Sequence, residues 1–310
     1  MALTFAATPR TVVARRTPRN RAARRNLTGW AFAGPATAIV VGLSIFPAVW
    51  AFFISRAKWN GIAPATQVGW HNYELLVRDP DMLAAARHTL LLTALFVPGS
   101  VLLGILVAIA LNQKIRLIGF YRTCIFVPYV ASAAATGILA GFVFNPQFGV
   151  ANDLLRRIGL PEQQFLESPS QALYVVCLVA LWGEVGFCAV VYLAALQDIP
   201  RELVEAARMD GAGPWRVFRH ITLPELRPVT VFVTVWQTIT AMQLFDLIYT
   251  TTKGGPLNST QTIVYYIYEL AFQTQRLGYG AAAAYLLFAV TLLLTLGVVW
   301  YSRRRGSEVF

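Results

Sequence analysis

Long apolar runs alternate with shorter polar stretches along the whole chain. The hydrocarbon core of a bilayer is about 30 Å thick, so a helix that crosses it needs about 20 apolar residues. Six windows reach that length and predict six membrane-spanning helices. They lie at roughly 29–55, 88–111, 120–144, 172–196, 229–250 and 281–302.

The windows favour helices over strands. Backbone N–H and C=O groups in lipid must be hydrogen-bonded within the protein, which leaves helices or closed β-barrels. Barrel strands alternate apolar and polar residues, and these windows are apolar without strict alternation. The predicted fold class is therefore an all-α membrane protein, a polytopic bundle of six transmembrane helices over residues 29–310.

Composition supports this class and leaves one question about the first window. Hydrophobic residues make up 56% of the 310 residues and charged residues 13%, about half the charged share of soluble domains.

The basic tail at 1–28 followed by an apolar run also resembles a signal peptide. However, the run from Trp30 to Ile54 is too long for one, and no small-residue cleavage site follows it. We expect a first spanning helix.

The distribution of positive charge predicts the orientation. Lys and Arg resist translocation, so they accumulate in cytoplasmic loops. If the N-terminus is cytoplasmic, the inner stretches hold 18 Lys and Arg, and the outer stretches hold 8. Both termini are therefore predicted to be cytoplasmic, and the net charge of +11 is attributed to topology and not to nucleic acid. The inner stretches are 1–28, 112–122, 197–228 and 303–310, and the outer ones are 56–87, 145–171 and 251–280.

Short interfacial helices are expected at 150–158 and 262–272.

Motifs for chemistry within this chain are missing. The phosphate-binding pattern GxxxxGK followed by Ser or Thr is absent, as are HExxH and GxSxG. Cys124, Cys177 and Cys188 fall in apolar segments without CxxC spacing, so disulfide or metal roles are not expected. An enzyme acting within the membrane is the weakest hypothesis, and we expect no cofactor bound by this chain.

The loop at 197–228 has a helical pattern of its own. Pro200 suits a first helical position, and Glu202 and Glu205 lie where the helix dipole favours negative charge. The helix is predicted to run from 200 to about 212, where Gly213-Pro214 would end it. A second amphipathic piece is expected from Trp215 to Ile221.

The faces of this helix suggest a docking surface. At 100° per residue, a small-residue apolar arc is separated from a face that carries carboxylates. Such an arc lets a neighbouring surface approach closely, as in a helix that fits a groove on a partner. The alternative is an amphipathic loop that only joins two spans. The arc comprises Leu203, Val204, Ala207 and Gly211, and the other face comprises Glu202, Glu205 and Met209.

The order of residues in this loop resembles a known signature. The EAA signature of membrane permease subunits in bacterial binding-protein-dependent ABC importers has the same residue types at the same spacing. The stretch from "LAALQDIP" to "LPELRP" resembles the maltose-type carbohydrate and glycerophosphate branch of that family. Further resemblance extends over about residues 85–302, although Lys253 departs from the neutral residue common there. The loop residues that carry the match or lie within it are Glu205, Ala206, Ala207, Asp210, Gly211, Ile221, Leu223 and Pro224.

The resemblance implies a mechanical role for the loop. The chain would adopt the type I ABC importer permease fold, and residues 200–212 would form the coupling helix, docked in a cleft of a cytoplasmic ATPase. Glu205 would contact that cleft, while Ala206, Ala207 and Gly211 would permit close packing. This chain would be non-catalytic.

The same resemblance implies partners and a location. Two cytoplasmic ABC ATPase subunits would bind ATP and Mg, and a second, similar permease would form a heterodimer with this chain. An extracytoplasmic solute-binding protein would deliver a carbohydrate or a related polyol or glycerophosphate compound. The location implied is the bacterial plasma (inner) membrane, among its lipids.

Polar residues inside the windows are candidates for the solute path. A charge at the membrane centre costs about 2.5–3.5 kcal/mol on insertion scales, so it normally faces protein or a watery cavity. Glu184 lies near the middle of its window, and Asp246 lies close to the outer end of the next one. Trp236, Gln237 and Gln243 add an aromatic ring and amides that suit a hydroxyl-rich solute. A helix-packing hydrogen bond remains the alternative for Glu184, and contact with interfacial water remains the alternative for Asp246.

Two other functions stay open from the residues alone. An ion-coupled secondary transporter of small polar solutes would need no ATPase. A membrane anchor or scaffold would have no transport role.

Overall fold

The computed structural model describes residues 31–113 and 116–304. The predicted basic tail at 1–28 lies outside these residues. The chain divides into two units, Met1–Phe53 and Ile54–Phe310, and each is considered by itself. The described part of the first unit belongs to one apolar helix, Ala31–Ser55, which includes η1 (Val41–Ile45) and α2 (Phe46–Ser55).

Among the described residues, five helices are long and apolar enough to cross a membrane, or six if a bent pair counts as one span. Ala31–Ser55 is the first. The others are α4 (Pro80–Leu111), α8 (Ala172–Asp198), the pair α12 (Arg227–Met242) and α13 (Asp246–Thr250), and α15 (Leu277–Arg304). The all-α membrane fold predicted from the windows is confirmed.

The window predicted at 120–144 is not one continuous helix. It consists of α5 (Ile118–Val130) and α6 (Ala133–Val143), which meet at an angle of 98°. Ala131 and Ser132 between them have extended backbone. Pro128, which has no N–H to donate, lies in the last turn of α5 and weakens it there. Hydropathy alone could not predict this bend, because both halves are apolar.

The polar stretches hold short elements. The outer helices predicted at 150–158 and 262–272 are confirmed by α7 and by α14 with η4. A two-residue antiparallel pair, β1 with β2, is the exception to the helical pattern among the described residues. The elements are β1 (Ala57–Lys58), β2 (Thr66–Gln67), α3 (His71–Arg78), α7 (Val150–Arg157), η2 (Phe165–Glu167), α9 (Arg201–Met209), α10 (Pro214–Val217), η3 (Phe218–Thr222), α11 (Leu223–Glu225), α14 (Ile263–Tyr268) and η4 (Glu269–Gln273).

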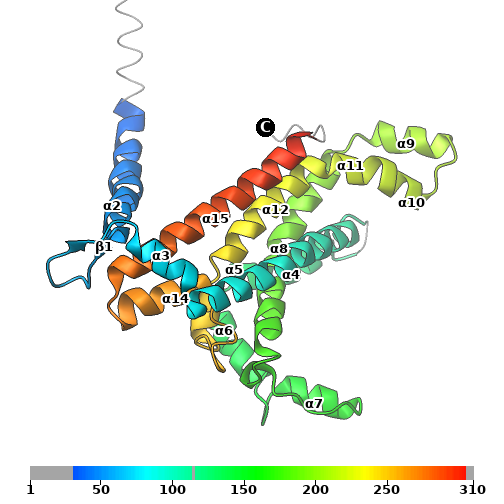
Figure 1. The fold of residues 1–310 in the computed structure, drawn as a ribbon. Helices are drawn as coiled ribbons and strands as arrows, with labels where there is room; N and C mark the ends of the chain where they lie inside the picture. The colour runs from blue at the N-terminus through cyan, green and yellow to red at the C-terminus, as the bar shows by residue number, and fades with distance from the viewer. Residues whose placement is uncertain (1–30, 114–115, 305–310) are drawn as a thin grey trace, which may run out of the picture. The chain divides into compact units, whose positions relative to one another are not determined.

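The packing of α4 along α8 forms the centre of the second unit (Figure 1). The two helices approach most closely at Gly104, where an added Cβ would lie 2.6 Å from the Cβ of Cys188. Around this contact, one buried cluster includes Ile105, Tyr192 and Val233 from three helices. A small residue at the crossing thus lets two backbones come together, as is typical of helix pairs in membranes.

The break between α12 and α13 is covered by protein. The backbone departs from the helix at Gln243–Phe245, which frees the carbonyl group of Leu244. The hydroxyl of Thr262 donates to that carbonyl at 3.2 Å. An irregular backbone at membrane depth is tolerated because such groups are satisfied by neighbouring protein.

The loops collect at two ends of the second unit (Figure 1). Residues 219–227 and the end of α15 line one groove. Residues 145–146, 166–167 and 251–256 line another cavity, at the opposite end of α8. This grouping is the same as the predicted division into inner and outer loops.

A carboxylate joins three segments at the second of these ends. Asp79 caps α4 by accepting from the N–H of Asp81 at 3.0 Å. Its other oxygen, Oδ2, accepts from the hydroxyls of Tyr266 and Tyr279, each at 2.7 Å. Burial by itself would raise the pKa of Asp79, but these hydrogen bonds outweigh it and the pKa lies below its ordinary value. The charged form therefore stabilises the fold above the ordinary pKa, and the contribution is lost as pH falls through the lowered one.

We expect the double substitution Tyr266→Phe/Tyr279→Phe to lower the melting temperature of the purified protein. Each lost hydrogen bond to the partly exposed carboxylate costs about 1 kcal/mol at pH 7, and the difference from wild type shrinks below about pH 4. Thermal unfolding in detergent at several pH values measures this effect. Tyr174→Phe, an exposed tyrosine on α8, is the control. A melting temperature equal to that of the control at pH 7 would contradict the prediction.

Candidate functional site

The loop that carries the signature forms a helical hairpin. Helix α9 runs over Arg201–Met209, so it is shorter than the predicted 200–212. Gly211 ends it, and Gly213-Pro214 instead begins α10. The N–H of Gly211 donates to the carbonyl of Arg208 and the N–H of Ala212 donates to that of Ala207. Gly211 has φ of 78°, a left-handed conformation that glycine adopts without steric cost.

The returning arm of the hairpin is also helical. α10, η3 and α11 follow one another from Pro214 to Glu225, where a second amphipathic piece was predicted. The rings of Trp215 and Phe218 lie 5.7 Å apart on this arm. α9 and α10 contact each other and project beyond the end of α8 (Figure 1). The hairpin is therefore a rigid protrusion on the end of the bundle.

Burial differs between the residues of α9, although Leu203 and Gly211 of the predicted arc remain exposed. Val204 and Ala207 are half-buried, whereas the other residues of α9 are exposed. The predicted apolar arc is thus partly covered by the chain's own returning arm. The exposed face is the one that carries Glu202, Glu205 and Met209. The arc was assigned to a partner because the sequence did not show that α10 folds back against it.

The exposed face has features of an interface without an occupant. Met209 is 89% exposed. Exposed apolar side chains of this size commonly mark interaction sites when they cluster with others. Trp215 is 68% exposed on the same hairpin. Within residues 31–113 and 116–304, no ion pair involves the carboxylate of Glu205. An external partner with a basic or amide group would complement this surface.

The structure separates the signature residues into two places. Glu205, Ala206, Ala207, Asp210 and Gly211 lie at the tip of the hairpin. Ile221, Leu223 and Pro224 lie at its root, where η3 and α11 lead into α12. The tip therefore presents the surface, and the root connects it to a spanning helix.

Two predicted path residues come together in the membrane. Glu184 on α8 accepts a hydrogen bond from the amide Nε2 of Gln237 on α12 at 3.3 Å. The same nitrogen lies 2.8 Å from Sγ of Cys188. Gln237 is fully buried, and its Oε1 has no hydrogen-bond partner among the described residues. The pair thus leaves one polar atom that a further donor could satisfy.

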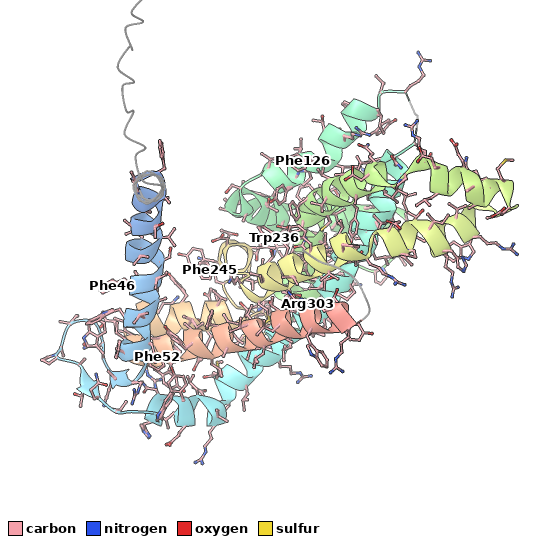
Figure 2. The ribbon with its side chains drawn as sticks, turned by 90° about the horizontal axis from the view of Figure 1, so that it is seen from above. Phe46, Phe52, Phe126, Trp236, Phe245 and Arg303 are labelled. Carbon is pink, nitrogen blue, oxygen red and sulfur yellow. The ribbon has the colours of Figure 1, made fainter. Side chains whose placement is uncertain are left out.

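An aromatic row beside this pair was not predicted, apart from Trp236. The ring centroids of Tyr129 and Phe187 lie 5.2 Å apart, and those of Phe187 and Trp236 lie 5.6 Å apart. Phe232 continues the row at 6.2 Å from Trp236. Figure 2 labels Trp236 on α12 and Phe126 on α5, the helices on either side of this row. Because the rings come from α5, α8 and α12, no local spacing in the sequence could have shown the row.

The remaining candidates lie elsewhere. Gln243 is the exposed C-cap of α12, and Asp246 is the exposed first residue of α13. Both lie at the break between these helices, whereas Glu184 has its hydrogen bond with Gln237. No group of three or more His, Cys, Asp or Glu side chains that could hold a metal ion occurs in the described part of the chain.

Comparison with protein families gives a match over two thirds of the chain. Residues 100–307 match the family described as "Binding-protein-dependent transport system inner membrane component". The matched range contains α8, the hairpin, α12 and α15.

Curated relatives cover most of the chain. A sulfoquinovosyl glycerol transport system permease of Agrobacterium fabrum is 35% identical over 84% of this chain and 85% of its own length. A lactose transport system permease of Rhizobium radiobacter is 33% identical over 90% and 95%. An sn-glycerol-3-phosphate transport system permease of Agrobacterium fabrum is 33% identical over 84% of this chain.

A solved structure shares the fold. A chain of a bacterial ABC transporter that imports the acidic polysaccharide alginate superposes with a TM-score of 0.82 at 24% identity, covering 94% of this chain and all of that one. A second structure of an alginate transporter, in complex with an alginate pentasaccharide-bound periplasmic protein, gives the same TM-score at 25% identity and covers 93% of this chain and 98% of its own.

We expect Gln237→Leu to lower the free energy of unfolding by about 1–3 kcal/mol, because it leaves the Glu184 carboxyl without its partner. The double substitution Glu184→Leu/Gln237→Leu is expected to recover part of that loss, since no polar group then remains unpaired. Melting temperatures of the four proteins in a double-mutant cycle measure the coupling. Strictly additive effects would show that the two side chains do not interact.

Proposed function

This chain belongs to the family of binding-protein-dependent transport system inner membrane components. From that membership we propose that it couples a cytoplasmic ATPase to the import of a carbohydrate or a related polyol or glycerophosphate solute. The coupling would pass through the hairpin α9–α11.

The identification as an ABC importer permease, made from the signature, is confirmed by the family match and by the permease relatives. The chain has the fold of a type I importer permease. It is a permease subunit, the non-catalytic component of such importers, and an inner membrane component. The alternative of an ion-coupled secondary transporter is not supported.

The exposed face of α9 is the observation that carries the coupling proposal. Glu205 has no ion pair among the described residues, and Met209 is 89% exposed. Both lie on the same face of α9. An apolar side chain beside a carboxylate fits a groove that has an apolar floor and a basic rim. An ATPase that closes on nucleotide would move this hairpin as one body, and α12 would follow because η3 and α11 join it without a flexible break.

The solute class is inferred from chemistry and relatives together. Flat aromatic faces beside a carboxyl–amide pair suit a solute with hydroxyl groups and apolar ring faces. The matched relatives are named for lactose, sn-glycerol-3-phosphate and sulfoquinovosyl glycerol. We therefore place Glu184, Gln237 and Trp236 beside the path of a sugar-like or glycerol-based solute, with Gln243 and Asp246 nearer its outer mouth.

The assembly and orientation follow from the same proposal. The hairpin end would be cytoplasmic together with both termini, including the tail at 1–28. The partners would be two ABC ATPase subunits that bind ATP and Mg, a second permease different from this chain, and a solute-binding protein on the outer side. One alginate transporter structure holds a periplasmic protein, which supports the last partner by analogy.

We expect Glu205→Lys to weaken ATPase binding at least ten-fold, because losing one partner of a buried charged contact costs about 2 kcal/mol or more. The readouts are the amount of ATPase that co-purifies with the tagged chain and the ATP hydrolysis of the complex. Membrane insertion should be unchanged.

Glu225→Lys is the matched control for this substitution. It makes the same charge change on the same loop, at an exposed position on α11. Normal ATPase recovery with Glu205→Lys, or equal losses in both variants, would contradict docking through the face of α9.

Purification in mild detergent followed by native mass spectrometry tests the assembly. We expect one copy of this chain, one different permease and two ATPase subunits. A complex with two copies of this chain would refute the heterodimer, and a complex without any ATPase would refute the coupling proposal.

A further inference from the structure

A groove of about 710 Å³ lies between α12 and α15, at the root of the hairpin. Its walls come from the two spanning helices and from the segment that joins η3 to α12. Arg303 marks this end of α15 in Figure 2. The lining residues used below are Arg219, Arg227, Val231, Leu293, Val298 and Tyr301.

The groove has two chemically different zones. Val231, Leu293 and Val298 make one part apolar, and Arg219 with Arg227 makes the other part basic. Thr230 and Thr234 also line it, but their hydroxyls donate to the carbonyls of Leu226 and Thr230 within the helix. Arg219 and Arg227 therefore supply the positive charge of the groove.

The depth of the groove corresponds to one leaflet of a bilayer. Leu293 and Tyr301 are eight positions apart on α15, which is about 12 Å along the helix axis. Half of the hydrocarbon core is about 15 Å. The end of α15 carries Trp300, Tyr301 and Arg303. Such residues are enriched at the membrane–water interface. The basic zone thus lies at the level of lipid headgroups.

The charge of the basic zone is uncompensated. No acidic residue is among those that line the groove. No ion pair within the described ranges involves Arg219 or Arg227. Two guanidinium groups in one groove favour a phosphate, which each can bind with paired hydrogen bonds.

We propose that this groove binds one anionic phospholipid. The phosphate contacts Arg219 and Arg227, and an acyl chain lies along Val231, Leu293 and Val298. Basic pockets between spanning helices at the cytoplasmic surface bind anionic headgroups in this way. Leu223 and Pro224 of the signature line the same groove, so the bound lipid contacts the root of the hairpin and stiffens its junction with α12.

Lipid binding needs only this chain and the membrane, so it can be tested apart from coupling. The full complex is exposed in detergent to an equal mixture of dioleoyl phosphatidylglycerol and dioleoyl phosphatidylcholine, and retained lipid is counted by native mass spectrometry. Wild type is expected to retain phosphatidylglycerol preferentially. Arg219→Gln/Arg227→Gln should reduce that preference roughly 25-fold, since each arginine contributes about a five-fold factor.

Two further variants make the result specific. Arg219→Lys/Arg227→Lys keeps the charge but loses the paired hydrogen bonds, so it should retain more of the preference than the glutamine double variant and less than wild type; this graded result excludes a folding defect as the cause. Arg116→Gln/Arg157→Gln removes two exposed arginines outside the groove and should behave as wild type. The proposal is overturned if wild type retains both lipids equally, as would occur if a partner subunit fills the groove. An unchanged preference in the glutamine double variant also overturns it.

Discussion

The lack of water in the hydrocarbon core is the constraint on which this structure depends. Every backbone N–H and C=O group at that depth must find a partner in the protein, since an unsatisfied group costs several kcal/mol. Long helices meet the requirement within one segment. Where the chain departs from a helix, at Gln243–Phe245, the hydroxyl of Thr262 supplies the missing donor. At this break, one freed backbone group is thus satisfied by another segment of the chain.

Side-chain polarity follows the same rule. Gln237 and the Glu184 carboxyl lie on different helices and hydrogen-bond each other within the bundle. Close approach of α4 and α8 at Gly104 holds α8 in place, and α8 in turn carries Glu184 and Phe187 toward α12. A polar pair and an aromatic row can therefore be kept inside an apolar bundle, which is the arrangement that a path for a hydroxyl-rich solute requires.

Outside the membrane the requirement is reversed, because water satisfies exposed groups at little cost. The hairpin can then leave Glu205 and Met209 exposed on a helix that is held by its own returning arm. Its root lies beside a groove lined by Arg219, Arg227 and the end of α15, which we propose to be a lipid site. A partner at the tip and a lipid at the root would thus act on the same junction with α12.

The sequence by itself determined the membrane class, the long helices and the family. These follow from local patterns: apolar length, and residue types at fixed spacing from Glu205 to Pro224. Only the tertiary structure decided the 98° bend between α5 and α6, the end of α9 at Gly211, the covered face of α9 and the meeting of Glu184 with Gln237. Most of these depend on contacts between segments far apart along the chain, and the bend separates two apolar halves. Hydropathy and spacing carry no information about which neighbour a side chain will meet.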